Sequence, residues 1–314
     1  MEKQATREAY GKALAELGKQ HANVVVLDAD LSKSTKTADF AKAFPDRFIN
    51  AGIAEQNMIG MSAGLAASGK VVYASSFAIF ATGRAFEQVR NSLAYARLNV
   101  KVCATHSGIT VGEDGGSHQS VEDIALMRAI PNMCVVVPSD GVTTQKAVFD
   151  LYDREGPAYL RLGRPSVPII YKDDIDFAIG KGIELRDGND ATLIACGIMV
   201  SKCMEAAEKL AQEGIQVSVV DMHTIKPLDE DLIIKKAVQT GAILTIEEHN
   251  VLGGLGGAVC EVVCEKCPVP VHRMGINDVF GQSGKPDELL QHYGLTIENI
   301  IQNIHDLLKI KTKS

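Results

Sequence analysis

Short apolar runs alternate with amphipathic segments along almost the whole chain, and this alternation limits the fold more than any other feature of the sequence. The runs are rich in Val, Ile and Ala and are too short for helices, whereas the segments between them repeat their apolar residues at helical spacing. Apolar strands separated by helices are typical of a parallel sheet that is buried on both faces. The sequence therefore predicts an α/β fold built from repeated strand and helix units.

The units fall into two sets, which predict two domains. In the first set, strands are expected at 24–27, 71–74, 100–105, 134–137 and 158–162, and helices at 6–20, 54–67, 84–97, 121–130 and 141–154. In the second set, strands are expected at 192–196, 217–221, 243–247 and 269–273, and helices at 201–213, 229–239, 255–266 and 296–309. Pro, Gly and Asp interrupt the pattern between the two sets. We expect an α/β domain over residues 1–165, a linker over 166–188 and a smaller α/β domain over 189–314.

Composition excludes several classes of protein. The chain has 314 residues, of which 46% are hydrophobic and 23% charged, and these are the proportions of a folded globular protein. A net charge of -7 argues against nucleic acid as a partner. The sequence has no apolar stretch of the roughly 18 residues that a membrane span needs, and its first residues are charged and amphipathic. We therefore expect a cytoplasmic protein that binds neither nucleic acid nor membrane.

Three of the seven cysteines, Cys260, Cys264 and Cys267, have the spacing of cysteines that hold an iron–sulfur cluster in radical enzymes. The same residues recur at helical spacing after a glycine-rich start. We therefore favour their place on an apolar helical stripe that faces a sheet. The seven cysteines predict no disulfide framework.

The glycine-rich segment Gly253–Gly257 lies between an expected strand and an expected helix. A helix N-terminus in this setting suits a phosphate group. The spacing, however, matches neither of the common phosphate-loop patterns, and glycines also permit a tight turn from strand to helix. We favour the structural role.

Glu55 stands at the start of the expected helix 54–67. A carboxylate in a first helical turn has an ordinary role, because the helix dipole favours negative charge there. The residues that follow, including Met58 and Ile59, predict a buried face. A carboxyl group in apolar surroundings tends towards its protonated form, which can donate a hydrogen bond. Glu55 is therefore a candidate for proton chemistry.

Polar residues are dense in the segment 104–119, which follows an expected strand. Ligand loops of open parallel sheets gather at such strand ends. The segment is compatible with a solvated surface loop, with a metal site of His106, Asp114 and His118, or with a loop that contacts a polyol and a phosphate. The intervals of eight and four residues between these three side chains are a weak indication of metal binding. The mixture of His, Asp, Ser and glycine backbone favours the polyol and phosphate contact.

Together, these segments resemble the transketolase family over essentially the whole chain. The motifs that carry the resemblance are Ala29-Asp30-Leu31, Gly52-Ile53-Ala54-Glu55-Gln56, Ser76-Phe77-Ala78-Ile79-Phe80, Thr105-His106, Gly112-Glu113-Asp114-Gly115, Ser117-His118-Gln119 and Arg161-Leu162-Gly163-Arg164. The chain is similar to the second half of a full-length enzyme, a pyrimidine-binding domain followed by a C-terminal domain. The resemblance implies thiamine diphosphate as the cofactor. It also implies transfer of a two-carbon glycolaldehyde unit from a ketose phosphate to an aldose phosphate.

The resemblance also implies roles for individual residues. Glu55 is similar to the glutamate that hydrogen-bonds the aminopyrimidine ring of the cofactor, and Phe77 and Phe80 are similar to the aromatic residues of the pyrimidine pocket. Asp30 resembles a residue beside the cofactor at the dimer interface. The remaining positions match residues that contact the sugar hydroxyls, Asp114 and His118, or that hold the phosphate of the sugar, Arg7, Ser34, His106 and Arg164. Three residues are expected to be catalytic: Glu55, His118 and His106.

One part of the family pattern is missing from the chain. Full-length enzymes carry a Gly-Asp-Gly motif and a downstream Asn that hold a divalent cation against the diphosphate, and Gly188-Asn189-Asp190 does not reproduce this motif. No metal ligand is therefore assigned here. The resemblance implies a separate N-terminal subunit that binds the diphosphate. This subunit would also provide most of the ligands of Mg2+ or another divalent cation. The expected assembly is a dimer of such pairs, with a homodimer contact through the pyrimidine-binding domain.

Other functions are compatible with the same residues. The chain could belong to a 1-deoxy-D-xylulose-5-phosphate synthase-like enzyme or be the β-type subunit of a 2-oxoacid dehydrogenase. The motif around Asp114 and His118 is shared with the deoxyxylulose enzyme, whereas Phe77, Phe80 and the segment 278–284 follow the transketolase pattern. A non-catalytic scaffold relative that keeps the fold is a further alternative. The sequence leaves the natural ketose and aldose open.

Overall fold

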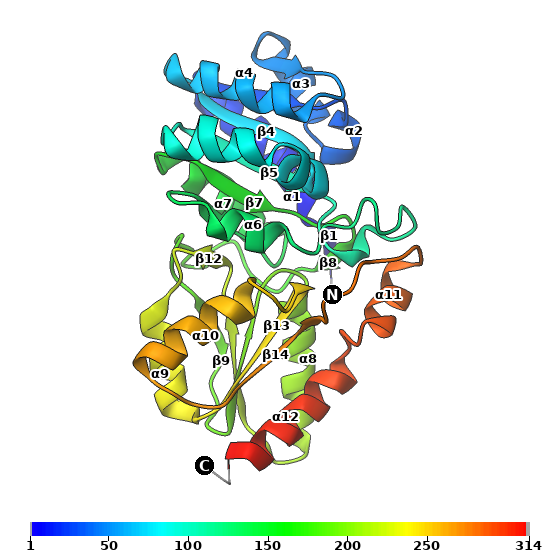
Figure 1. The fold of residues 1–314 in the computed structure, drawn as a ribbon, viewed down its shortest axis with the longest axis vertical. Helices are drawn as coiled ribbons and strands as arrows, with labels where there is room; N and C mark the ends of the chain where they lie inside the picture. The colour runs from blue at the N-terminus through cyan, green and yellow to red at the C-terminus, as the bar shows by residue number, and fades with distance from the viewer. Residues whose placement is uncertain (1, 312–314) are drawn as a thin grey trace.

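Two α/β units are stacked along the long axis of the molecule in the computed structural model, which describes residues 2–311 (Figure 1). Each unit has one sheet whose strands are mostly parallel and whose two faces are covered by helices. The α/β fold predicted from the alternation of strands and helices is confirmed. Within these residues, no helix combines the length and the apolar character needed to cross a membrane.

The N-terminal unit is built on a seven-stranded sheet with the order β12-β6-β7-β5-β4-β2-β3. Its strands are β2 (Val24–Asp28), β3 (Phe48–Asn50), β4 (Val71–Phe77), β5 (Val100–Thr105), β6 (Cys134–Val136), β7 (Ala158–Arg161) and β12 (Thr224–Lys226). The helices α1 (Thr6–Gln20) and α7 (Gly141–Asp153) pack on one face, where Leu14 and Leu17 meet Val24 and Val26. On the other face lie α4 (Glu55–Ala67) and α6 (Asp123–Ala129). The short helices α2 (Ser32–Thr35) and α3 (Ala38–Ala43) follow β2.

The C-terminal unit is built on a five-stranded sheet with the order β14-β13-β10-β11-β9. Its strands are β9 (Ile183–Arg186), β10 (Ala191–Ala195), β11 (Val217–Asp221), β13 (Ile243–Asn250) and β14 (Val271–Ile276). Its helices are α8 (Met199–Gln212), α9 (Glu230–Thr240), α10 (Leu255–Lys266), α11 (Pro286–His292) and α12 (Ile297–Lys311). Figure 1 shows α9 and α10 on one side of this sheet and α8 and α12 on the other. A separate pair of strands, β1 (Lys3–Ala5) and β8 (Ser166–Pro168), runs antiparallel.

Two strands depart from the expected parallel arrangement. β9 runs antiparallel to β11, and β12 runs antiparallel to β6. Both are short, at four and three residues, so they carry too little periodicity to be recognised in the sequence. β9 and β8 lie inside the segment 166–188 that we expected to be a linker. The domain boundaries stay a proposal.

The helix expected at 84–97 has a different form. The chain is π-helical at Ile79–Arg84 and Val89–Tyr95, with one α-helical turn at Phe86–Gln88 between them. Four buried residues of this segment, Ala81, Ala85, Val89 and Leu93, recur at every fourth position, and Thr82 and Ala94 are buried beside them. An α-helix has about 3.6 residues per turn, so a strict four-residue repeat stays on one face only when the turns are wider.

The prediction that the three cysteines lie on an apolar stripe holds only in part. Cys267, at the C-cap of α10, packs against the hydrophobic core, whereas Cys260 and Cys264 lie outside the buried face of the helix. The buried face of α10 consists of Leu255, Gly256, Ala258, Val259, Val262 and Val263. Cys264 is exposed, and Cys260 and Cys267 are only partly buried. The buried face includes the adjacent pairs Ala258-Val259 and Val262-Val263. Cys260 and Cys264 are the next residues in the chain after these pairs, so the turn of the helix places them nearer to solvent.

The glycine-rich turn before α10 has a structural role. Glu247, within β13, accepts hydrogen bonds from the backbone N–H groups of Leu255 at 2.7 Å and Gly256 at 2.8 Å. A Cβ on Gly254 would lie 2.0 Å from a Glu247 carboxylate oxygen. The helix N-terminus therefore already holds an anion from this chain, in the position that a phosphate group would take.

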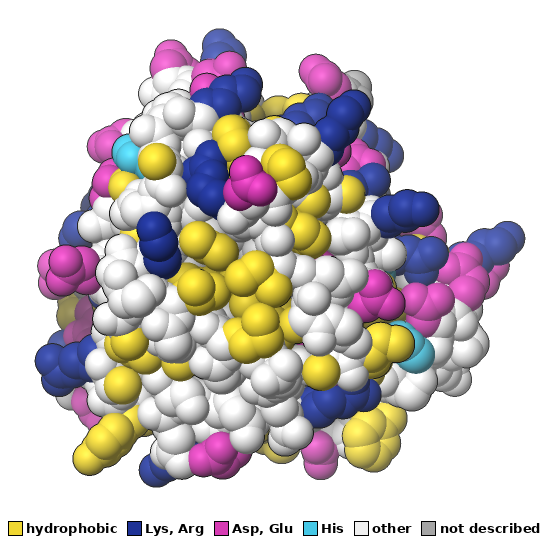
Figure 2. All heavy atoms as spheres, turned by 90° about the horizontal axis from the view of Figure 1, so that it is seen from above, with side chains coloured by type: hydrophobic (Ala, Val, Ile, Leu, Met, Phe, Trp, Pro, Cys, Tyr) yellow, Lys and Arg dark blue, Asp and Glu magenta, His cyan; other side chains and the backbone are white. Residues whose placement is uncertain are grey.

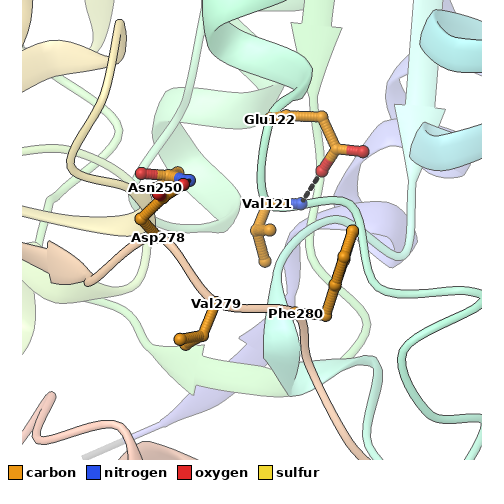
Figure 3. A pocket seen from close by; sticks show the side chains of 6 residues that line it. All are labelled: Val121, Glu122, Asn250, Asp278, Val279 and Phe280. Carbon is orange, nitrogen blue, oxygen red and sulfur yellow. Dashed lines mark hydrogen bonds between the residues drawn. The ribbon is translucent and has the colours of Figure 1, made fainter.

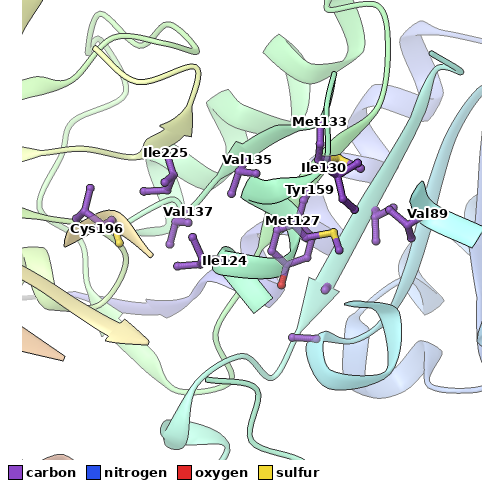
Figure 4. Close-up of a cluster of buried hydrophobic side chains, with 14 of the residues drawn as sticks. Val89, Ile124, Met127, Ile130, Met133, Val135, Val137, Tyr159, Cys196 and Ile225 are labelled. Carbon is purple, nitrogen blue, oxygen red and sulfur yellow. The ribbon is translucent and has the colours of Figure 1, made fainter. Parts of the chain in front are cut away.

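One of the hydrophobic clusters extends across both units. Figure 4 shows Ile124 and Val137 of the N-terminal unit beside Cys196 and Ile225, which come from later in the chain. All four side chains belong to one continuous cluster of buried residues. Because β12 also joins the N-terminal sheet, segments of both units contribute to one folded body.

A buried ion pair of the N-terminal unit also contacts the C-terminal unit. The Arg161 guanidinium donates to both carboxylate oxygens of Asp123, at 2.7 and 3.2 Å, and to the backbone carbonyl of Glu248 on β13 at 3.0 Å. The Arg161 side chain is 5% exposed and that of Asp123 is 0% exposed. Removal of one partner of such a pair is costly, because the other charge stays buried without compensation.

We expect Arg161→Met to lower the free energy of unfolding by about 3–5 kcal/mol. Urea denaturation followed by circular dichroism measures this quantity. A suitable control is Arg90→Met, since Arg90 is exposed and its guanidinium bonds only the neighbouring Asn91 side chain. The control is expected to change stability by no more than about 0.5 kcal/mol. A loss for Arg161→Met as small as that of the control would contradict the prediction.

Candidate active site

The carboxyl ends of β2, β4, β5 and β7 meet at one edge of the seven-stranded sheet, because these strands run parallel. This is the edge at which open α/β sheets bind ligands. Phe77 is the last residue of β4, and His106 directly follows β5. The sequence therefore places several of its candidate residues on neighbouring strand ends.

Glu55, the first residue of α4, is buried with 1% of its side chain exposed. Its two carboxylate oxygens have separate partners. Ser76 Oγ on β4 donates to Oε1 at 3.1 Å, and Arg84 Nη1 donates to Oε2 at 2.8 Å. Glu55 lies on the buried face that the sequence predicted, but its surroundings are not purely apolar, because a hydroxyl and a guanidinium face this carboxylate.

Arg84 is a site residue that the sequence analysis missed. Its guanidinium lies 4.4 Å above the centre of the Phe80 ring, in addition to its contact with Glu55. Both Arg84 and Phe80 belong to the first π-helical segment, a geometry that is frequent at functional sites. The apolar residues at every fourth position from Ala81 to Leu93 were an indication in the sequence of an unusual helix there.

Four rings form one aromatic group. The Phe77 and His106 rings stack with centroids 3.9 Å apart, and the Phe77 and Phe80 rings are 6.1 Å apart and nearly parallel. The His118 ring meets Phe80 edge-on at 5.4 Å. Phe77, Phe80, His106 and His118, which were all predicted as site residues, are therefore brought together.

His106 is held in one protonation state by its surroundings. Burial, together with the positive charges of Arg7 and Arg164, lowers the pKa of His106 to about 3. The ring is therefore neutral near pH 7. Arg7 Nη1 lies 3.4 Å from Nε2 and has no lone pair, so Nε2 accepts. The proton then resides on Nδ1, which donates to Thr105 Oγ1 at 2.9 Å.

We expect His106 to remain neutral at pH 5, where a histidine with an ordinary pKa of about 6.5 is mostly protonated. Side-chain NMR between pH 8 and 5 measures this, and the spectrum of His106→Asn identifies the resonance. A titration midpoint near 6 would contradict the prediction.

The residues predicted to hold a phosphate lie close to His106. Arg7 at the start of α1 donates to the backbone carbonyl of Ser34 in α2 at 3.0 Å. Arg164 Nη1 donates to the carbonyl of Val111 and lies 3.7 Å from a carboxylate oxygen of Asp114. Arg7 and Arg164 therefore place two cationic groups near the buried imidazole.

Asp30 lies two residues after the carboxyl end of β2. It has a left-handed backbone with φ of 65°, is exposed, and accepts a hydrogen bond from Asn50 at the end of β3 at 2.9 Å. Within residues 2–311, no group of three or more His, Cys, Asp or Glu side chains could hold a metal ion. Both ring nitrogens of His106 already have partners, which argues against the metal site of His106, Asp114 and His118.

Two family models match the sequence in tandem. The pyrimidine-binding domain of transketolase matches residues 2–169, and the C-terminal domain of transketolase matches residues 180–300. The chain belongs to the transketolase family. Membership implies thiamine diphosphate and a divalent cation as cofactors, and it supports a role as a transferase subunit.

Several relatives of this transketolase-family chain are of the same length. A protein of Methanocaldococcus jannaschii, provisionally described as a transketolase C-terminal section, is 54% identical over 96% of this chain and 96% of its own length. The 6-deoxy-6-sulfo-D-fructose transketolase subunit SqwH of Clostridium sp. (strain MSTE9) is 42% identical over 99% of this chain and 97% of its own length. Human transketolase is 41% identical over 98% of this chain, which spans only 49% of the human protein.

Solved structures have the same fold. One described as "Split gene transketolase, inactive beta4 tetramer" has a TM-score of 0.92 and 54% identity, and covers 98% of this chain and 99% of its own. Its similarity extends over both units of the transketolase-family chain.

Proposed function

We propose that this chain is the C-terminal subunit of a split transketolase. Together with a separate N-terminal subunit, it transfers a two-carbon glycolaldehyde unit from a ketose phosphate to an aldose phosphate. The observation that carries the proposal is the buried Glu55 carboxylate paired with Arg84, which lies over the Phe80 ring, with the cationic groups of Arg7 and Arg164 close to the same aromatic cluster. Residues suited to bind a flat ring and residues suited to bind an anion thus lie at the same edge of the seven-stranded sheet.

The residues present fit the pyrimidine part of thiamine diphosphate. A buried carboxylate offers a strong hydrogen-bond acceptor for a nitrogen heterocycle, and the faces of Phe77 and Phe80 offer apolar area for a flat ring. Bound thiamine diphosphate supplies the carbon nucleophile that breaks and re-forms the carbon–carbon bond. Glu55 holds the pyrimidine ring by a hydrogen bond, and one of its carboxylate oxygens shares the proton of that bond with the ring.

The diphosphate and the cation need ligands from elsewhere. Since the described residues hold no group of three or more potential metal ligands, we assign the diphosphate and most of the Mg2+ coordination to the N-terminal subunit. The similar structure that is described as an inactive β4 tetramer of a split-gene transketolase supports this need for a second kind of subunit.

On the substrate side, the chain binds the sugar with residues from three segments. Arg7 and Arg164 bind the terminal anion, for which guanidinium groups are well suited. His106 is neutral, so it orients Arg7 and Thr105 and adds no charge of its own. His118 and Asp114, on the 106–119 loop, contact the sugar hydroxyls, and Ser34 lies beside Arg7.

A homodimer contact through the N-terminal unit completes the proposed assembly. Figure 2 shows hydrophobic side chains gathered on the end of the molecule that carries α3 and α4. Ile53, two residues before α4, is 80% exposed, and α4 itself exposes small residues at Gly60, Gly64 and Ala67. We propose that a second copy covers this face, with Asp30 near the contact.

A transfer assay with the assembled complex tests the proposal. The two subunits are purified together and supplied with thiamine diphosphate and Mg2+, and a panel of ketose and aldose phosphates is offered, with pentose phosphates first. The name of the Clostridium relative is that of a sulfosugar enzyme, so a sugar with a terminal sulfonate belongs in the panel. Release of carbon dioxide from pyruvate would instead favour a deoxyxylulose-phosphate synthase-like or 2-oxoacid dehydrogenase activity.

A further inference from the structure

Two segments that are far apart in the sequence lie against each other beside the candidate active site. One is the 106–119 loop, which carries Asp114 and His118. The other is the 277–285 segment of the C-terminal unit, which joins β14 to α11. Figure 1 shows this connection next to the loops at the edge of the N-terminal unit. Gln119 makes a side-chain hydrogen bond between the two segments.

Gln119 is 3% exposed, and its amide nitrogen faces three backbone carbonyls. Nε2 donates towards Ile109 O at 3.1 Å and Gly112 O at 3.2 Å within the loop, and towards Gln282 O in the 277–285 segment at 2.9 Å. An amide NH2 group has two hydrogens, so the three carbonyls share them. One side chain therefore closes the loop on itself and joins it to the other unit.

The two backbones approach so closely that side chains are excluded. A Cβ on Gly281 would lie 1.7 Å from Gln119 Oε1, and a Cβ on Gly116 would lie 2.5 Å from the carbonyl oxygen of Gly281. A Cβ on Gly115, where φ is +77°, would lie 2.5 Å from Ser283 Oγ. The path of the loop therefore depends on where the 277–285 segment lies.

The C-terminal unit also contacts the start of the loop. Glu248 on β13 is buried, and its Oε1 accepts a hydrogen bond from the backbone N–H of Thr110 at 2.7 Å. A Cβ on Gly108, where φ is +75°, would lie 2.3 Å from the Glu248 carboxyl group. Both ends of the loop are thus held by residues of the C-terminal unit.

The residues just after the loop continue this contact. The backbone N–H of Asn250 donates to the carbonyl of Val121 at 2.7 Å. Figure 3 shows Val121 and Glu122 across a shallow pocket from Asp278, Val279 and Phe280. The interface between the loop and the C-terminal unit is therefore continuous beyond Gln119.

We propose that Gln119 is a positioning residue, through which the C-terminal unit sets the place of Asp114 and His118 for the sugar. The amide fixes the loop to the 277–285 segment, and the loop presents its polar side chains to the substrate. The proposal rests on the proposed function, because the substrate contact of the loop is part of that function. Whether Gln119 keeps the loop ordered can be measured without any substrate.

The test uses one variant from each side of the contact. Gln119→Leu removes the donor, and Gly281→Ala forces the Gln119 side chain to move without changing the loop itself. Gly257→Ala is the matched control, since a Cβ there meets only Arg128 Nη1 at an ordinary 3.9 Å. Global unfolding of each variant is followed in parallel, and Gly281→Ala keeps the test valid if Gln119→Leu does not fold.

Hydrogen exchange of the chain alone is the first readout. The amides of Gly115, His118 and Gln119 bond to carbonyls within the loop and report on its order. We expect them to exchange about tenfold faster in both variants, with exchange in β10 and β13 unchanged, because local opening becomes easier. Wild-type exchange rates at these amides would overturn the proposal.

Kinetics of the assembled complex are the second readout. We expect KM for the sugar phosphate to rise about tenfold while kcat falls less, with the binding of thiamine diphosphate measured by calorimetry unchanged. Faster loop exchange with an unchanged KM would overturn the positioning role. If the wild-type complex transfers no sugar unit at all, the proposed function fails, and hydrogen exchange still decides whether Gln119 holds the loop.

Discussion

Replacement of Glu55 by glutamine is expected to lower kcat of the assembled complex by about 10²- to 10⁴-fold, the usual contribution of a positioned acid or base. The amide has nearly the same shape as the carboxyl group, so the packing around α4 is preserved. It cannot carry the proton that the proposed chemistry requires. Steady-state kinetics at saturating thiamine diphosphate measure the effect, and circular dichroism checks the fold.

Arg84→Met is the control for this experiment. Glu55→Gln removes both the acid and its ion pair with Arg84, whereas Arg84→Met removes the ion pair and leaves the carboxyl group in place. We expect the control to lose far less activity, since Ser76 still donates to Glu55. Near wild-type turnover of Glu55→Gln would show that Glu55 does not act as the acid or base of the reaction.

The second large effect concerns the partner. Purified alone, the chain is expected to show no measurable transfer between sugar phosphates, and activity is expected to appear when the N-terminal subunit, thiamine diphosphate and Mg2+ are added. The physical reason is that a diphosphate needs a cation and fixed donors, and residues 2–311 offer no cluster of metal ligands. Titration of the chain with its partner at constant cofactor, followed by the transfer rate, measures this dependence.

Two controls make this result decisive. The partner alone must be inactive as well, and heat-denatured chain must not restore activity. If Glu55 has the proposed role and the N-terminal subunit is required, the Glu55→Gln chain still assembles with the N-terminal subunit, but the resulting complex is nearly inactive. Tight binding of thiamine diphosphate and Mg2+ by the chain alone, with turnover of sugars, would contradict the assignment to a split enzyme.

Much of the fold could be predicted from the sequence because buried parallel strands are apolar over their whole length. Val100–Thr105 and Val217–Asp221 were predicted with the bounds that the structure has. The short strands β3, β9 and β12 were missed because three or four residues carry almost no periodicity. The antiparallel pairing of β9 and β12 was missed for the same reason.

The candidate site was predictable only in part. Glu55, Phe77 and His106 stand in motifs that resemble a known family, and the neighbouring strand ends at which Phe77 and His106 lie explain why these two rings meet. Arg84 and the hydroxyl of Ser76 were not assigned contacts with Glu55, because no spacing rule relates residues on different elements. The tertiary contacts of Gln119 and Glu248 were hidden for a further reason, since their partners lie 163 and 138 residues away in the chain.

The strand β12 has a consequence for anyone who divides this protein for study. It lies within the C-terminal half of the sequence but forms the outermost strand of the N-terminal sheet, next to β6. A fragment that stops near residue 165 would leave the hydrogen-bonding groups of β6 open to water and to other copies. Unprotected strands of this kind recruit further chains and promote aggregation. The halves recognised by sequence comparison are therefore poor units for separate expression.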